Sequence, residues 1–147
     1  MIDEAYIHIA GNQPSTDFVA ATLSKLYGMA GLRAGAAIAR PDLLEKIRPY
    51  RAGALPVTGL VGATASLRAK NVVPERRKII KDIREDTFAF LDKHNFKYVP
   101  SVSNKFMLDS GRPGRVWPSW PTYVRVSVGA RDEMARFKDA WLRVMSA

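Results

Sequence analysis

The stretch from Pro74 to Asn95 constrains the fold more than any other part of the chain. Its apolar residues recur at nearly helical spacing, and charged residues occupy the positions between them. The pattern predicts a long amphipathic helix, which needs a second apolar surface to cover one of its faces. The apolar positions are Ile79, Ile80, Ile83, Phe88 (or Thr87), Phe90 and Leu91.

Strand patterns lie on both sides of this helix and can supply that surface. Alternating or β-branched runs predict strands, and a proline or a polar residue before an apolar run predicts a helix start. A strand–helix–strand beginning and a strand-rich end closed by a helix predict an α/β or α+β protein with two packing units. Strands are expected over 4–10, 34–39 (tightly packed), 97–99, 105–108 and 123–128, and further helices over 41–48, 56–70 and 130–145.

The composition excludes several classes of protein. The chain has 147 residues, of which 47% are hydrophobic, so it can build a core without covalent staples. It has no cysteine and two histidines, which excludes disulfides and cysteine nucleophiles and makes a metal site unexpected. It has no apolar stretch long enough to span a membrane and no basic signal region near its start. We therefore expect a cytoplasmic protein without a membrane partner.

The net charge is unusual for such a chain. Lys and Arg number 23 against 14 acids, which gives +9 at pH 7. The densest basic cluster, Arg76, Arg77, Lys78 and Lys81, is interleaved with acids. Two interpretations stay open: a solvated helix face, which the interleaving favours, or a surface that binds an anion, nucleic acid or a partner chain.

Residues 22–35, TLSKLYGMAGLRAG, are the most informative for chemistry. Lys25 has no charged neighbour until Arg33, and the residues around it are small or apolar. Desolvation disfavours the charged ammonium and leaves a nucleophilic amine that can attack an aldehyde. A surface lysine at the start of a glycine loop is the other interpretation. The glycines do not have the spacing of a dinucleotide-binding fingerprint.

Four motifs carry a resemblance to a known family. They are DEAY at 3–6, TLSK at 22–25, GLRAG at 31–35 and YVRVSVG at 123–129, in this order. Together they resemble the second half of a class I/II aminotransferase that depends on pyridoxal 5'-phosphate, in the subgroup similar to histidinol-phosphate aminotransferases. The resemblance implies a fold class of α/β: a remnant of the large-domain sheet over 1–55, with the lysine loop, followed by connecting helices and a small C-terminal α+β domain over 56–147.

The resemblance also implies roles for residues around the cofactor ring. Lys25 would bind the cofactor aldehyde covalently and later move a proton. Asp3 would lie beside the pyridine nitrogen and keep it protonated, and Tyr6 would donate a hydrogen bond to the ring oxygen. Outside the resemblance, Asp3 is an ordinary acid near the chain start and Tyr6 a core aromatic.

Further residues are implied for the phosphate and the substrate. Thr22 or Ser24 would hold the cofactor phosphate together with Arg33, which suits a forked, charge-assisted contact. Arg125 would bind the carboxylate of an amino acid. Asn104 would line the substrate pocket, as the tryptophans at 117 and 120 could, although packing of the loops is the other interpretation for all three.

The implied activity is amino-group transfer between an amino acid, or a similar amine, and a 2-oxo acid, in a homodimer or other self-associated form.

The chain is about half the family's length and lacks the half that completes the cofactor site. The interval from Asp3 to Lys25 is shorter than in the family by about one strand, so residues 18–23 are expected to lead from a short helix directly into the lysine loop. The alternative function is a non-catalytic basic module that binds an anion, nucleic acid or a partner chain.

Overall fold

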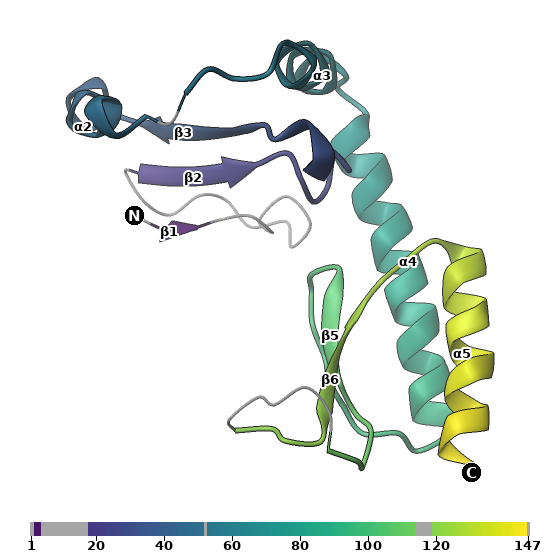
Figure 1. Cartoon of the computed structure of the whole chain (residues 1–147). Coiled ribbons are helices and arrows are strands. Elements are labelled where there is room, and N and C mark those ends of the chain that lie inside the picture. Colours follow the sequence, from purple (N-terminus) through teal and green to yellow (C-terminus); the bar gives the residue numbers. More distant parts are fainter. Residues whose placement is uncertain (1, 4–17, 52, 114–118, 147) are drawn as a thin grey trace. The chain divides into compact units, whose positions relative to one another are not determined.

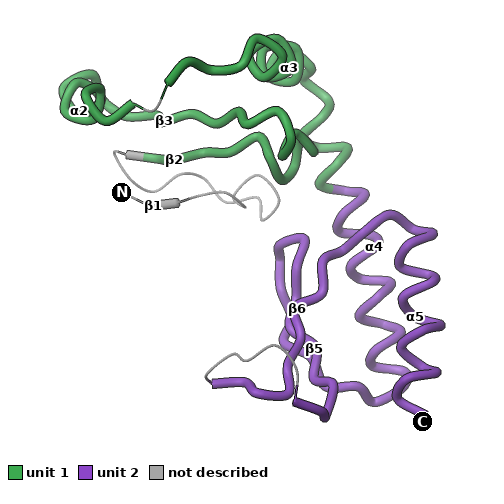
Figure 2. The backbone as a smooth tube through the Cα atoms, in the orientation of Figure 1, with its two compact units in different colours: residues 1–77 green, residues 78–147 purple. Residues whose placement is uncertain are grey.

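The computed structural model describes residues 2–3, 18–51, 53–113 and 119–146. Its contacts divide the chain into two compact units, 1–77 and 78–147, which Figure 2 shows in different colours. The boundary falls inside the long helix α4 (Val72–Lys93), labelled in Figure 1. The expected family domains, with a division near residue 55, stay a prediction. Among the described helices, none is long and apolar enough to cross a membrane.

The first unit contains a three-stranded sheet in the order β1-β2-β3. β1 (Ile2–Asp3) runs parallel to the central strand β2 (Phe18–Thr22), and β3 (Gly35–Ala39) is antiparallel to β2. The expectation that no strand precedes the lysine loop is therefore wrong. β2 forms because it pairs on both edges and buries Val19, which is 5% exposed.

The predicted strand β3 is present but is not tightly packed as expected. Every residue from Gly35 to Ile38 is exposed, and the Ile38 side chain retains 60% of its accessible surface. β3 is an edge strand, because no described strand pairs with its outer edge. The strand predicted over 4–10 lies outside the described residues.

Short helices follow the strands of the first unit. The 3-10 helix η1 (Ala30–Leu32) lies between β2 and β3, and α2 (Pro41–Ile47) begins with proline, as is common at a first helical position. A further 3-10 turn, η2 (Arg48–Tyr50), precedes α3 (Val57–Arg68). α3 lies against η1 at Gly59, where a Cβ atom would stand 2.5 Å from the Leu32 carbonyl oxygen.

The second unit is a small α+β arrangement. Its antiparallel sheet has the order β4-β5-β6, and α4 and α5 lie beside the sheet in Figure 1. The sequence predicted each of these elements, with small differences at their ends. They are β4 (Tyr98–Val99), β5 (Lys105–Asp109), β6 (Tyr123–Ser127) and α5 (Arg131–Met145).

The core of the second unit is rich in rings and leucines. Leu91 of α4 and Leu108 of β5 are fully buried together with Phe106. The rings of Phe96 and Trp141 meet edge to face, with centroids 6.0 Å apart, so α5 is attached to the end of α4. Because side chains alternate along a strand, β5 turns Phe106 and Leu108 toward this core and leaves its other residues on the opposite face.

Candidate functional site

The predicted lysine lies in a well-defined loop between two paired strands. Residues 23–34, the lysine loop, connect β2 to β3, and the Leu23 N–H closes the loop by donating to the Ala34 carbonyl at 3.2 Å. The loop is anchored by buried apolar side chains, among them Leu26 and Tyr27 at 3% and 8% exposure. Lys25, which directly precedes these two anchors, is half-buried. The loop therefore packs against the rest of the first unit through these buried side chains.

The turn after Lys25 is held from two directions. The Gly28 N–H donates to the Lys25 carbonyl at 3.1 Å, and Gly28 adopts a left-handed conformation with φ 67° that glycine tolerates best. From α4, the Arg76 guanidinium donates to the Leu26 carbonyl at 3.1 Å. The backbone around Lys25 is thus fixed by a local turn and by a cation from a distant part of the sequence.

Two hydroxyl groups precede Lys25 in the sequence and interact with each other. Thr22 Oγ1 donates to Ser24 Oγ at 2.8 Å, and it accepts the Ser24 backbone N–H at 3.1 Å. Both residues are half-buried at the point where β2 ends. Hydroxyl and backbone N–H donors of this kind suit the oxygens of a phosphate.

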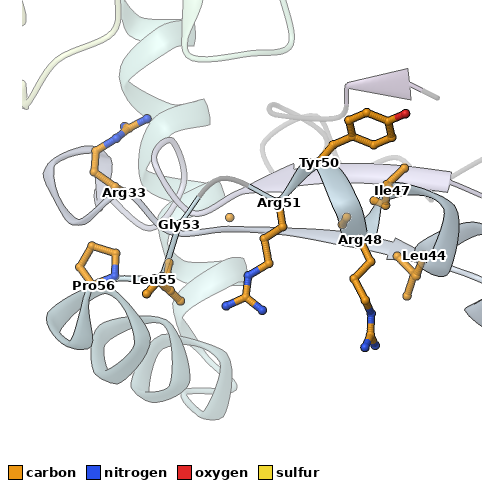
Figure 3. A pocket seen from close by; sticks show the side chains of 12 residues that line it. Arg33, Leu44, Ile47, Arg48, Tyr50, Arg51, Gly53, Leu55 and Pro56 are labelled. Atoms are coloured by element: carbon orange, nitrogen blue, oxygen red, sulfur yellow. The ribbon is translucent and has the colours of Figure 1, made fainter.

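Arg33 lies at the far end of the same loop. It has φ 54°, is exposed, and donates through Nη1 to the Ala30 carbonyl at 2.9 Å. Arg33 also lines an open pocket of about 940 Å³ together with Arg48 and Arg51. In Figure 3 the side chains of Arg48 and Arg51 extend in one direction, and that of Arg33 extends in another. Lys25 is not among the residues that line this pocket.

The two remaining residues predicted for the cofactor precede the lysine loop. Asp3 lies in β1, directly opposite Ala20 of β2, so its backbone is held two positions along the sheet from Thr22. The side chain of Asp3 is outside the described part of the structure, and so is the whole of Tyr6. Their predicted contacts with the cofactor ring stay predictions.

The residues predicted for the substrate belong to the second unit. Arg125 is an exposed residue of β6 and pairs in register with Met107 of β5. Asn104 precedes β5, and its carbonyl accepts the Val128 N–H at 2.9 Å. Its Oδ1 atom is buried and has no hydrogen-bond partner among the described residues. A buried amide oxygen without a donor costs free energy, so it is a position where a bound N–H or O–H group would be favoured.

The basic cluster is largely engaged within the chain. Arg76 binds the Leu26 carbonyl, Arg77 is half-buried, and Lys78 pairs with Asp82 at 2.7 Å. The hydrogen bond from Lys78 lowers the pKa of the Asp82 carboxyl. Lys81 lies 3.7 Å from Glu85. These contacts support the solvated-face interpretation of the cluster.

The donor groups of the lysine loop fit pyridoxal 5'-phosphate. The loop carries one primary amine, Lys25, which an aldehyde requires, and the hydroxyls of Thr22, at the end of β2, and of Ser24, with the guanidinium of Arg33, suit a dianionic phosphate. All four groups belong to the short segment from Thr22 to Arg33, whose ends are held by the strand pairing. Sequence reasoning missed Arg76 as part of this arrangement, because nothing local to residue 76 indicates a contact with the loop.

Nearly the whole chain matches one protein family. Residues 1–145 match the family described as aminotransferase class I and II, and the chain therefore belongs to it. Within the family it is histidinol-phosphate aminotransferase-like. It is 28% identical to histidinol-phosphate aminotransferase 2 of Haemophilus influenzae, over 99% of this chain and 47% of that protein. It is 35% identical to an aromatic amino acid aminotransferase of Cutibacterium acnes, over 76% of this chain and 35% of that protein.

Solved structures show the same fold. A histidinol-phosphate aminotransferase from Sinorhizobium meliloti, in complex with pyridoxal-5'-phosphate, matches with a TM-score of 0.81 and 21% identity over 98% of this chain and 48% of that one. An aminotransferase from Staphylococcus aureus matches with a TM-score of 0.77 and 20% identity, over 98% and 48%. The chain thus spans about half the length of its relatives.

Segments are also missing inside the matched stretch, as expected. The alignment with the Haemophilus protein extends over 176 positions, whereas this chain has 147 residues, so the relative carries residues that this chain lacks. The strand before the lysine is present as β2, so its loss is not the cause of the difference.

Proposed function

We propose that this chain carries the cofactor-attachment loop and the carboxylate-binding strand of an aminotransferase that moves an amino group between an amino acid, or a similar amine, and a 2-oxo acid. The observation that supports this most strongly is the lysine loop, with Lys25 half-buried directly after the mutually hydrogen-bonded hydroxyls of Thr22 and Ser24, in a chain that belongs to the family. When bound, pyridoxal 5'-phosphate supplies an electron-accepting ring that stabilises negative charge at the substrate's Cα.

The residues of the chain would divide the work of binding. Lys25 provides the amine that attaches the cofactor, and the same amine holds or moves the proton at the substrate's Cα. Thr22, Ser24 and Arg33 provide donors for the phosphate, and Arg33 must turn from the Ala30 carbonyl to make a forked contact. The exposure of Arg33 makes that rotation inexpensive, because no packed side chain has to move with it.

Two groups that precede the loop would address the ring. Asp3 would keep the ring nitrogen protonated, and the pairing of β1 with β2 supports its backbone for that role. Tyr6 would donate to the ring oxygen. In the second unit, Arg125 would bind the substrate carboxylate, and the buried Asn104 Oδ1 would accept a donor from the substrate side of the site.

The experiment is specific attachment of the cofactor. The purified chain is mixed with pyridoxal 5'-phosphate, reduced with borohydride and digested, and the modified lysines are identified by mass spectrometry. We expect the label to concentrate on Lys25 and the visible absorbance band to disappear in Lys25→Ala. The exposed Lys70, which follows α3, provides the matched control variant Lys70→Ala. Labelling spread evenly over the exposed lysines would reject the proposal.

Turnover is a separate measurement, because the chain spans about half of its relatives. A labelled chain that releases no 2-oxo acid from any amino acid would show a cofactor-binding protein without transaminase activity. Release of a 2-oxo acid that stops after one equivalent would show the first half of the reaction alone.

We also propose that the chain associates with itself. Three apolar side chains of α3 are largely exposed: Val57, Leu60 and Val61 at 76%, 54% and 62%. Their spacing of three and four residues places them on one face of the helix, and an exposed apolar face is typical of an interface. Light scattering should give a mass of two chains or more, and a strictly monomeric mass at high concentration would contradict this.

The alternative, a non-catalytic basic module, has one observation in its favour. The pocket beside Arg33 is also lined by Arg51 and by Arg48, which pairs with Glu45 at 3.0 Å, and no acid is among the described residues that line it, which suits an anion. Binding of a duplex or of phosphate that depends steeply on salt and is unaffected by Lys25→Ala would favour it. The cytoplasmic location stays a prediction.

A further inference from the structure

The outer edge of β3 carries none of the usual protection of a sheet edge. β3 pairs with β2 along its five residues, and no described strand pairs with its other edge. Native edge strands are commonly protected against further pairing by a lysine, a proline or a bulge. The sequence of β3, GAAIA, has no charge and no proline, and its register with β2 is continuous. This edge is therefore able to accept another strand.

The pairing with β2 decides which backbone groups of β3 point outward. Directly beside the ladder, the Ala34 carbonyl accepts the Leu23 N–H at 3.2 Å, so this pair is of the hydrogen-bonded kind. In an antiparallel ladder, hydrogen-bonded and non-hydrogen-bonded pairs alternate. Gly35 and Ala37 therefore direct their N–H and C=O groups to the open edge, whereas Ala36 between them bonds to β2.

The residues of β3 that line the pocket of about 940 Å³ are the same two, Gly35 and Ala37. The other walls come from α2, η2 and the segment 53–56, and they include the apolar side chains of Leu44, Ile47 and Leu55. Ligand pockets usually enclose about 300–1,000 Å³, so this pocket is near the upper end of that range. The outward backbone groups of β3 thus border a space that is large enough for a segment of chain.

The walls of this pocket also carry positive charge. Arg48 and Arg51 extend in one direction in Figure 3. Arg48 pairs with Glu45 at 3.0 Å, whereas the Arg51 guanidinium makes no hydrogen bond or ion pair with the described part of the chain. No acid is among the described residues that line the pocket. A carboxylate of a ligand would therefore give Arg51 a charge-assisted partner.

A polypeptide matches both the backbone groups and the charge. The open edge offers alternating donors and acceptors, and an extended peptide offers the complementary groups at the same spacing. A phosphate group supplies acceptors but no donor for the outward carbonyls of β3. A second copy of this chain would bring the same arginines toward Arg48 and Arg51, and like charges in an interface are unfavourable. An acidic peptide has neither disadvantage.

We propose that an extended acidic peptide binds along β3 as an additional strand, with its backbone paired to Gly35 and Ala37 and a carboxylate at Arg51. Apolar side chains of the peptide would cover the apolar wall of the pocket. The proposal goes beyond the aminotransferase role, because it requires neither the cofactor nor Lys25.

The test follows hydrogen exchange of the whole chain in the presence of capped heptapeptides. The main probe alternates valine with glutamate. One comparison peptide has lysine in place of glutamate, and another is the glutamate peptide with N-methylated backbone amides. We expect the glutamate peptide to slow exchange at the Gly35 and Ala37 amides at least about tenfold. The Ala36 and Ile38 amides, which already bond to β2, should change less than about twofold.

The affinities of the peptides separate charge from strand pairing. The glutamate peptide should bind at least about tenfold more tightly than the lysine peptide, because only the former can pair with Arg51. It should also bind at least about tenfold more tightly than its N-methylated form, which keeps the charge and lacks the backbone donors.

Variants assign the two contributions to residues. Arg51→Gln should weaken binding of the glutamate peptide at least about fivefold, whereas Arg68→Gln, at an exposed arginine that ends α3, should leave it unchanged. Ala37→Pro removes an outward N–H, at a kind of edge position where proline is tolerated, and should also weaken binding at least about fivefold. The comparison of peptides on the unmodified chain decides the matter even if a variant fails to fold.

Several outcomes would overturn the inference. Equal binding of the glutamate and lysine peptides, or of the glutamate peptide and its N-methylated form, would do so. Protection of Gly35 and Ala37 that rises with the concentration of the chain alone would show that a second copy occupies the edge. Tighter binding of inorganic phosphate or of a short DNA duplex would favour the anion-binding module instead. Attachment of the cofactor at Lys25 without peptide binding would support the proposed function and reject this inference alone.

Discussion

Arg76 donates a hydrogen bond from Nη1 to the carbonyl oxygen of Leu26 at 3.1 Å, across 50 residues of sequence. The same nitrogen would stand 3.2 Å from a Cβ atom at Gly28, so the guanidinium fills the space beside the turn. The position of the turn after Lys25 therefore depends on a side chain from α4 as well as on the loop itself.

Replacing Arg76 by Met should loosen the lysine loop. The change leaves the Leu26 carbonyl without its charged donor, and a hydrogen bond to a charged group contributes about 1.5–3 kcal/mol. Hydrogen exchange at the Gly28 and Met29 amides, which donate to Lys25 and Leu23, should become at least about tenfold faster. The control is Lys78→Met, which removes an exposed ion pair worth about 0–1 kcal/mol and should leave both amides unchanged.

Replacing Gly59 by Ala should destabilise the contact between α3 and η1. The added Cβ would lie 2.5 Å from the backbone oxygen of Leu32, so one of the two helices must move. Overpacking of this kind costs about 1–3 kcal/mol, measured as a lower urea midpoint. At Gly31 a Cβ meets no atom within 4 Å, so Gly31→Ala should change stability by less than about 0.5 kcal/mol. Equal losses in the two variants would show that α3 and η1 are not in close contact.

The ionised carboxylate of Asp109 should stabilise the second unit, and this contribution should be lost at acidic pH. The Gly111 N–H donates to Asp109 Oδ1 at 2.9 Å and, with a contribution from Thr122, holds the pKa of the carboxyl below its usual value. The folded pKa is thus below the unfolded one, which is about 3.9. The resulting stability is present above that value and is lost as pH falls through the folded pKa.

The measurement is the urea midpoint as a function of pH. The urea midpoint of Asp109→Asn should fall less than that of the unmodified chain between about pH 5 and pH 2. The variant has no carboxylate at this position, so it has no such contribution to lose. Asp139→Asn removes an exposed carboxylate from α5 of the same unit and serves as the control. If both variants follow the unmodified chain in parallel, Asp109 does not contribute to the acid dependence.

Replacing Leu91 by Ala should strongly destabilise the second unit. Leu91 is completely buried against Phe106 and Leu108, so truncation removes apolar contact and leaves a cavity, at a cost of about 2–5 kcal/mol. Leu60→Ala, at a leucine that is 54% exposed on α3, should cost less than about 0.5 kcal/mol. Thermal unfolding followed by circular dichroism gives both values, and a loss at Leu60 as large as at Leu91 would be inconsistent with this core.

The helices and most strands could be predicted from the sequence, because their patterns are local. The apolar repeat of α4 includes Ile83 and Leu91, which are buried, and the alternation over 123–128 corresponds to β6. The position of Lys25 in a glycine loop was also evident, since small and apolar residues surround it.

The remaining features depend on partners far away in the sequence. β2 was missed because its five residues, FVAAT, are a short run without a polar alternation, and pairing on both edges makes them a strand. Arg76 looked like one more charge on a solvated helix, and only the fold brings it to Leu26. The row formed by Val99, Met107 and Arg125 depends on strand register, which single residues do not indicate.

The boundary between the two compact units has a practical consequence for anyone who divides the gene. It falls between Arg77 and Lys78, inside a continuous helix, and not in a linker. A cut there would leave each product with new helix ends whose backbone N–H and C=O groups have lost their partners one turn away. A shorter chain that starts before Val72 keeps the helix whole and is the better choice for studying residues 78–147 alone.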